Sequence, residues 1–318
     1  MDELDLHYRT VLQALTAGRV VPFLGAGANL CGRPRETAWQ PGRDFLPSGV
    51  ELARHLARCF NCPAEASNDD LARVSQFVDV MTGSGPLYET LHDLFNHDFP
   101  PTALHRFLAG LPGLLESHGY PRRYPLIVTT NYDDLMERAY RELEEPCDVV
   151  SYVADGEKRG KFLHWKPDGE VVLIETPNEY RGLNVGERPV LLKIHGAVDR
   201  RGADNDSFVI TEDHYIDYLT RTNLTNLIPA TLAAKLKRSH LLFLGYGLSD
   251  WNLRVILHRI AGEQKLNYKS WAIQRHPQEL DKQFWFRRDV DILNVDLSEY
   301  VTALVRRIGE IEPLEAAR

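Results

Sequence analysis

The feature that most constrains this chain is a set of short apolar runs, each of which leads into a turn residue or a polar residue. Longer stretches with helical patterning lie between most of the runs. Strands buried on both faces of a parallel sheet read as continuous apolar runs, and helices connect them. The sequence therefore predicts an α/β fold, a Rossmann-like parallel sheet with helices on both faces. The predicted strands are 19–24, 124–129, 190–194, 240–244, 270–274 and 290–295.

Two long intervals between these runs predict insertions. A crossover between parallel strands needs only about a dozen residues, and the interval between the first two runs is far longer. Its helical patterns predict an inserted helical module at 46–122. The second interval predicts an irregular insertion at 145–238 with a β-hairpin around a Lys-Pro-Asp-Gly turn. The helical patterns lie at 50–60, 70–81 and 87–95, their breaks are expected at Pro100-Pro101, Pro112 and Pro121, and the hairpin strands lie at 161–165 and 170–175.

Charge and composition exclude several classes of function. The chain of 318 residues carries 37 basic and 45 acidic residues and a formal net charge of −8. This is the wrong sign for sequence-independent binding to phosphate backbones. No apolar run reaches the roughly 18 residues that span a bilayer, and the first residues lack a signal-peptide pattern. We therefore expect a cytoplasmic protein that binds neither nucleic acid directly nor membrane.

The cysteines predict that no metal is bound. They are too few and too scattered for a disulfide framework. Cys59 and Cys62 form a CxxC pair, but a structural zinc site normally needs four ligands, and no second CxxC or close Cys/His pair supplies the others. We interpret the pair as small residues on one helix. The four cysteines are Cys31, Cys59, Cys62 and Cys147.

The first two predicted strands lead into candidate site residues. Gly25 and Gly27 follow the first strand and would let the backbone N–H groups of a tight turn approach a pyrophosphate. The third glycine of the dinucleotide fingerprint is absent, since Leu30 occupies its position, so a plain tight turn is the alternative. After the second strand, Asn131 and Asp133 place an amide and a carboxylate at the strand end, where capping of the next helix is the alternative.

Two further strand ends carry a histidine and a second glycine turn. His195 follows the third strand and precedes a glycine. A lone histidine is usually structural, but this one is expected at the same edge of the sheet as the polar turns. Gly245 and Gly247 follow the fourth strand, so two glycine turns could hold two parts of one long ligand. Ser249 or Asp250 equally suits the N-cap of the next helix.

Four motifs in this order, GAGAN, TTNYDDL, KIHGAVD and FLGYGLSDWNL, resemble those of the sirtuin superfamily, and specifically its bacterial branch of NAD-hydrolysing antiphage proteins. The resemblance spans most of the chain and implies one sirtuin-like catalytic domain over 1–318, with NAD as substrate. It makes Asn131, Asp133 and His195 the reaction centre. The implied NAD-binding residues are Gly25, Ala26, Gly27 and Asn29 at the pyrophosphate, Gly245, Tyr246, Gly247 and Ser249 on the adenosine or ribose side, and Thr130.

One departure from the sirtuin pattern bears on activity. Deacylating sirtuins carry two CxxC pairs after the catalytic histidine, whereas this chain has no cysteine after Cys147, so we expect no zinc ribbon. The resemblance then implies an NAD+ glycohydrolase that releases nicotinamide and ADP-ribose and acts as a toxic effector of antiphage defence. Its implied activator is a partner, a ligand or oligomerisation. The implied partners are further copies of the chain or a second defence subunit, namely an ATPase, an Argonaute or a sensor.

Two other functions stay open from the sequence. The first is an NAD-dependent protein deacylase or ADP-ribosyltransferase of the sirtuin type, which incubation with NAD alone separates from a hydrolase. The second is a non-catalytic module that binds NAD or ADP-ribose as a regulatory signal. Such a module would not need Asn131, Asp133 and His195 together.

Overall fold

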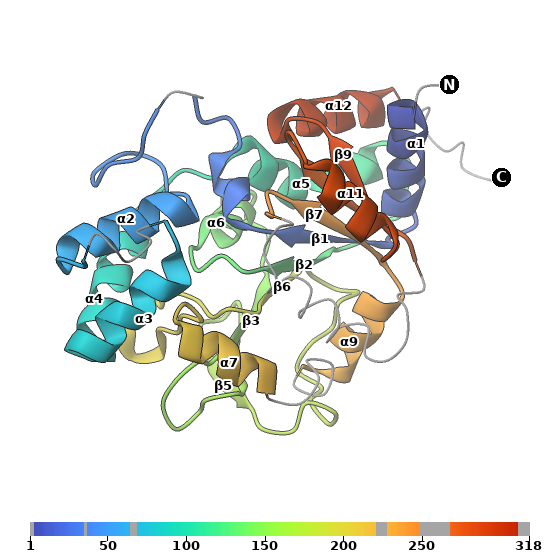
Figure 1. The fold of residues 1–318 in the computed structure, drawn as a ribbon. Coiled ribbons are helices and arrows are strands. Elements are labelled where there is room, and N and C mark those ends of the chain that lie inside the picture. The colour runs from blue at the N-terminus through green and yellow to red at the C-terminus, as the bar shows by residue number, and fades with distance from the viewer. Residues whose placement is uncertain (1–2, 35–36, 64–68, 221–227, 248–267, 311–318) are drawn as a thin grey trace.

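A single mostly parallel sheet lies at the centre of the computed structural model, which describes residues 3–34, 37–63, 69–220, 228–247 and 268–310 (Figure 1). Its strands are β1 (Val20–Leu24), β2 (Leu126–Thr129), β3 (Asp148–Tyr152), β4 (Phe162–Trp165), β5 (Val171–Ile174), β6 (Val190–Lys193), β7 (His240–Leu244), β8 (Ser270–Gln274) and β9 (Val290–Asn294). The strand order is β5-β4-β3-β6-β2-β1-β7-β8-β9. Every neighbouring pair from β3 to β9 in this order is parallel, and β4 and β5 add an antiparallel edge. The predicted α/β fold with a Rossmann-like sheet is confirmed.

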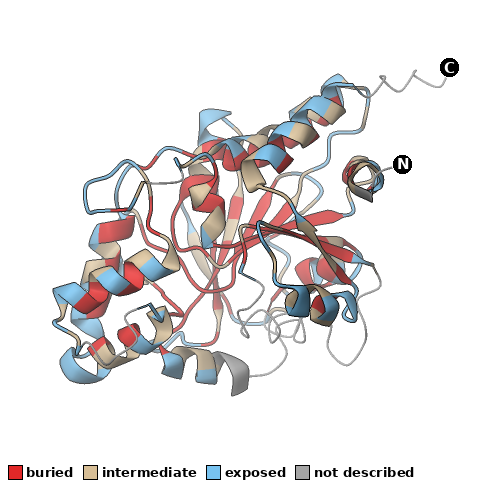
Figure 2. Ribbon diagram, turned by 45° about the horizontal axis from the view of Figure 1, so that its top comes forward, coloured by how far each residue is buried: buried red, intermediate tan, exposed pale blue. Residues whose placement is uncertain are grey.

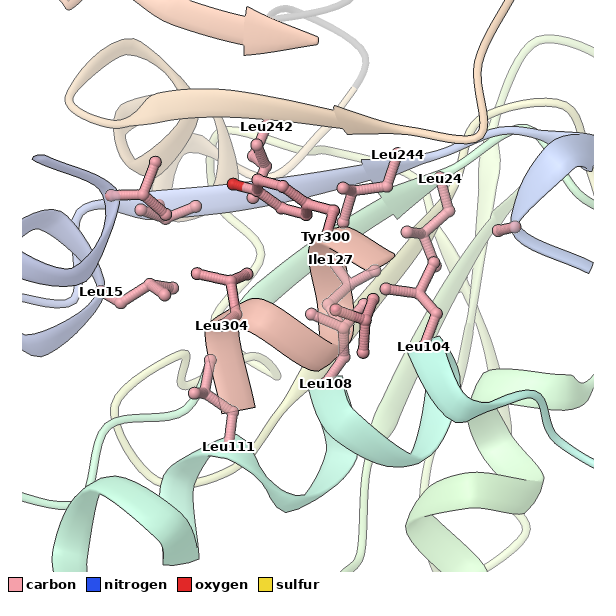
Figure 3. Close-up of a cluster of buried hydrophobic side chains, with 14 of the residues drawn as sticks. Leu15, Leu24, Leu104, Leu108, Leu111, Ile127, Leu242, Leu244, Tyr300 and Leu304 are labelled. Carbon is pink, nitrogen blue, oxygen red and sulfur yellow. The ribbon is translucent and has the colours of Figure 1, made fainter. Parts of the chain in front are cut away.

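Helices cover both faces of the sheet, because alternate side chains of each strand are buried on opposite sides. The covering helices are α1 (Glu3–Thr16), α5 (Ala103–Ser117), α6 (Leu135–Glu142), α9 (Ala230–Lys237), α11 (Glu279–Phe286) and α12 (Leu297–Gly309). Val21 and Phe23 of β1 face α9 and α11, whereas Val20 and Leu24 face α1, α5, α6 and α12. Figure 3 shows part of the apolar cluster that contains Leu24, and Figure 2 shows how much of the sheet is buried. Burying one leucine side chain stabilises the folded state by about 1.5–3 kcal/mol. The apolar clusters on the two faces of the sheet therefore hold the strands, and the residues that follow them, in place.

Three helices between β1 and β2 lie to one side of the sheet (Figure 1). They are α2 (Gly49–Cys59), α3 (Leu71–Thr82) and α4 (Ser84–Phe95), and α7 (Glu212–Thr220) packs against α3. Ser48 and Glu51 form a capping box at the start of α2, and Asp70 caps α3. The helices bury a separate apolar cluster that also includes Tyr132 and Phe208. This cluster joins the three helices to the loops at the carboxyl ends of the strands.

The structure differs from the sequence analysis at two segments. Pro112 lies inside α5, so the break expected there is wrong. Leu108, Leu111 and other residues of α5 are buried against the sheet, and this packing outweighs the hydrogen bond that proline cannot make. α5 therefore covers the sheet although it lies within 46–122. The segment 145–238 contains the expected hairpin, β4 and β5, and also supplies β3 and β6 to the sheet.

The described residues give two further findings. None of their helices combines the length and the apolar character that crossing a membrane requires. In the same ranges, no three His, Cys, Asp or Glu side chains come together as a group that could hold a metal ion. α2 ends at Cys59, and Cys62 lies beyond it, so the prediction that both cysteines lie on one helix is wrong. The Cys59 sulfur lies 3.5 Å from Nε2 of His55. The absence of a metal stays a prediction for elemental analysis.

Candidate active site

The carboxyl ends of β1, β2, β6 and β7 open into one cavity of about 1100 Å³. This edge is where open α/β sheets bind ligands. Every candidate site residue that the structure describes lines this cavity, and Ser249 lies outside the described residues. The candidates that line it are Gly25, Ala26, Gly27, Asn29, Thr130, Asn131, Asp133, His195, Gly245, Tyr246 and Gly247.

The two glycine turns in the cavity wall interlock. The N–H of Gly25 donates to the carbonyl of Leu244 at 3.1 Å, and the N–H of Gly27 donates to the carbonyl of Gly245 at 2.8 Å. A Cβ on Gly27 would lie 2.6 Å from the Gly245 carbonyl oxygen, and Gly245 itself has a φ of +68°. Glycine is therefore required at these positions because a side chain would prevent the two turns from packing together. The amides of Gly25 and Gly27, which we expected to approach a pyrophosphate, already donate to protein carbonyls.

Two amides and a carboxylate form a hydrogen-bonded cluster on the cavity wall. Nδ2 of Asn29 donates to Oδ2 of Asp133 at 2.7 Å. Nδ2 of Asn131 donates to the Gly25 carbonyl at 3.1 Å and lies 3.3 Å from Oδ1 of Asn29. Oδ1 of Asp133 also accepts the N–H of Leu135 at 3.1 Å, so this carboxylate caps α6 as well as lining the cavity. The capping and the site interpretations of Asp133 are compatible.

His195 enters the cavity from the end of β6. It is 4% exposed, and burial lowers the pKa of its imidazole to about 3. The ring is therefore neutral near pH 7 and can accept a proton. Its centroid lies 5.6 Å from that of Tyr215, with the planes at 77°. The next residue, Gly196, has a φ of +89° and packs directly on the Ser207 backbone, which fixes the direction in which the chain leaves the histidine.

The charge of the cavity is acidic. The described lining contains Asp69, Asp70, Asp133 and Glu212 and has no lysine or arginine. A positively charged ring is favoured there. A second cavity of about 810 Å³ shares Gly27 and the Gly245 turn with the first and includes arginines. Those arginines are Arg33, Arg54 and Arg275. Each of these arginines is paired with a carboxylate, Arg33 with Glu51, Arg54 with Asp69 and Arg275 with Asp296, so the second cavity is closer to neutral than its arginines alone would indicate.

One part of the cavity wall, supplied by α7, was not predicted from the sequence. Glu212, Tyr215 and Ile216 line the cavity, although α7 follows no strand of the sheet. Nε2 of Gln76 donates to Asp213 at 2.9 Å and so ties α7 to α3. The available signal was the apolar run 208–210 followed by Thr211, whose hydroxyl oxygen accepts the N–H of His214 at the helix start.

A comparison with known domain families assigns this arrangement. The SIR2-like domain family matches residues 125–293, more than half of the chain, including β2, β6 and β7 with their turns. The chain belongs to the SIR2-like family. The predicted membership of the sirtuin-like family is therefore confirmed.

Several curated relatives share this SIR2-like region. Defense-associated sirtuin 2 of Bacillus subtilis is 27% identical over 280 residues, which cover 86% of this chain and 22% of the relative. NAD(+) hydrolase ThsA of Acinetobacter baumannii (strain 532279) is 29% identical over 210 residues, 66% of this chain and 35% of the relative. NAD(+) hydrolase ThsA of Bacillus cereus (strain MSX-D12) is 25% identical over 263 residues, 80% of this chain and 46% of the relative. The matched region thus spans less than half the length of each of these relatives.

Proposed function

We propose that this SIR2-like chain is an NAD+ glycohydrolase that cleaves NAD+ to nicotinamide and ADP-ribose. The observation that carries the proposal is the meeting of Asn131, Asp133 and His195 at one acidic cavity beside two interlocked glycine turns. Relatives named NAD(+) hydrolase ThsA support the same reaction. NAD is the substrate, and the proposal includes no metal.

The acidic cavity suits the first step of this reaction. Breaking the bond between nicotinamide and ribose produces a ribosyl cation that resembles the oxocarbenium ion of glycoside hydrolysis. The bond's electron pair leaves with nicotinamide, which becomes neutral, so no strong general acid is needed. The Asp133 carboxylate would engage the nicotinamide amide or stabilise the positive charge that develops on the ribosyl carbon. Asn29 and the N–H of Leu135 hold that carboxylate in place.

The second step is attack of water on the ribosyl carbon. Asn131 would orient a ribose hydroxyl or the water, since its amide is held by the Gly25 carbonyl and by Asn29. The neutral His195 would accept a proton from the water or from a ribose hydroxyl. Because burial lowers the pKa of His195 to about 3, we expect it to act as a weak base whose effect depends on position.

The biological role we propose is that of an antiphage effector in the cytoplasm. A relative named defense-associated sirtuin 2 supports a role in defence. Unrestrained loss of NAD would harm the host cell, so we propose that oligomerisation, a ligand or a second defence subunit activates the chain. That subunit would be an ATPase, an Argonaute or a sensor.

Incubation of the protein in its activated form with NAD+ and no acylated peptide tests the reaction. A hydrolase releases nicotinamide and ADP-ribose in equal amounts without any acylated peptide. A deacylase or ADP-ribosyltransferase would consume NAD only when an acylated peptide or an acceptor is added. A regulatory module would bind NAD in calorimetry and form no product. NAD consumption only with an added peptide or acceptor, or NAD binding without product, would contradict the proposal.

A further inference from the structure

Lys193 is the last residue of β6 and is almost completely buried, with 1% of its surface exposed. Lysine is almost never fully buried unless its ammonium group is paired. Lys193 lies two residues before His195 on the same chain segment. Its burial beside the reaction centre therefore requires an explanation that the reaction steps above do not give.

The Lys193 ammonium group contacts two elements other than its own strand. Nζ donates to the backbone carbonyl of Asp133 at 2.5 Å and to Oε1 of Glu137 at 2.7 Å. Asp133 belongs to the turn after β2, and Glu137 belongs to α6. One side chain thus connects the strand that carries His195 to the turn that carries Asn131.

The contact with the Asp133 carbonyl fixes the backbone from which the catalytic carboxylate projects. The Asp133 side chain is held separately by Asn29 and by the N–H of Leu135. The N–H of Asn131 donates to Oγ1 of Thr129 at 3.0 Å. Two backbone hydrogen bonds already join this turn to the segment that carries His195: the N–H of Ile194 donates to the Thr129 carbonyl and the N–H of Val198 donates to the Tyr132 carbonyl, both at 3.0 Å. Lys193 adds a side-chain contact to the Asp133 carbonyl, between those two points.

We propose that Lys193 is a positioning residue of the reaction centre, which sets Asn131 and Asp133 at a fixed distance from His195 through its bond to the Asp133 carbonyl. This inference rests on the proposed NAD+ glycohydrolase function. It separates two effects of Lys193. The ion pair with Glu137 offsets the burial of the ammonium group, and the bond to the carbonyl aligns the site.

A half-buried lysine of α9 provides a control. Nζ of Lys235 in α9 also donates to a backbone carbonyl, that of Gly18, at 2.5 Å. Gly18 precedes β1, so this contact lies at the opposite edge of the sheet from the cavity. Substitution of Lys235 removes a comparable lysine-to-carbonyl contact without touching the reaction centre.

The test measures nicotinamide release and thermal unfolding for the full chain and three variants. Lys193→Met should lower kcat by about 10²-fold, the loss expected when a reacting group is displaced by about 1 Å. KM should change by less than about threefold. Lys193→Arg keeps N–H donors for the carbonyl and should recover most of kcat. Lys235→Met should lower the melting temperature while kcat stays at the wild-type value.

Three results would overturn the inference. They are a wild-type kcat in folded Lys193→Met, a loss in Lys235→Met as large as that in Lys193→Met, and an effect of Lys193→Met on KM alone. If Lys193→Met does not fold, Lys193→Arg decides, because a folded Arg variant without turnover contradicts the role of the donor. Absence of nicotinamide release from the activated wild type would instead overturn the proposed function, and this inference with it.

Discussion

Gly196→Ala should both destabilise the protein and misplace His195. Gly196 has a φ of +89°, and an added Cβ would lie 2.1 Å from the carbonyl oxygen of Ser207, where ordinary contact begins at 3.4 Å. The left-handed backbone costs a non-glycine residue about 1–2 kcal/mol. Relieving the overlap requires the backbone to move by about 1 Å, and overpacking of this kind costs about 1–3 kcal/mol. The free energy of unfolding should therefore fall by about 2–5 kcal/mol.

The displacement should act on His195 as well, because the strained residue directly follows it. The N–H of Val209 donates to the His195 carbonyl at 2.9 Å, and the N–H of Ser207 donates to the Ala197 carbonyl at 3.0 Å. A shift of about 1 Å in these backbone hydrogen bonds would displace His195 by a similar distance and should lower NAD turnover by about 10²-fold. Urea unfolding and nicotinamide release measure the two effects.

Gly156→Ala is the matched control for this substitution. Gly156 has a φ of +74°, and an added Cβ would meet no atom within 4 Å. It therefore carries the backbone strain without the overlap and should lose only about 1–2 kcal/mol, with unchanged turnover. Equal destabilisation by the two substitutions, or normal turnover in Gly196→Ala, would refute the argument from the Ser207 contact.

Three further predictions concern the turns, pH and metal. Gly27→Val should lower the melting temperature as well as weaken NAD binding in calorimetry, because its side chain would meet the Gly245 carbonyl; unchanged stability would contradict the interlock. Burial lowers the pKa of His105 to about 4, so between pH 6.5 and pH 4 the unfolded chain is protonated at this residue and the folded chain is not, and the free energy of unfolding should fall as the pH falls. His105→Gln should reduce that dependence in urea titrations, with the other buried histidines supplying the remainder. Elemental analysis should find no stoichiometric zinc, and one zinc per chain would contradict the interpretation of Cys59 and Cys62.

The sheet could be predicted because its strands are continuous apolar runs. β8 has the predicted bounds, 270–274, and β7 likewise matches 240–244. β3 was missed because polar residues interrupt its pattern. Asp148 is buried there, and its carboxylate is hydrogen-bonded to Nε2 of His164 at 2.9 Å and to Nε of Arg188 at 2.6 Å. Such a strand depends on partners far away in sequence, which a local pattern does not contain.

The site could be predicted where it follows strand ends, and not where it depends on packing between helices. Asn131 and His195 follow apolar strands, so the parallel topology alone brings them to one edge. Tyr215 reaches the cavity only because α7 packs on α3. The role of Lys193 likewise requires knowledge that its side chain is buried and crosses to Asp133.

The central claim is that His195 and Asn131 carry out NAD cleavage in this cavity, and steady-state nicotinamide release from alanine variants tests it most directly. His195→Ala and Asn131→Ala should each lower turnover by about 10²-fold or more, with much smaller changes in melting temperature. His7→Gln is the control, since His7 is also buried and its Nε2 lies 2.9 Å from the Tyr300 hydroxyl, away from the cavity. It should lose stability and keep its turnover. Turnover near the wild-type rate in folded His195→Ala would contradict the account.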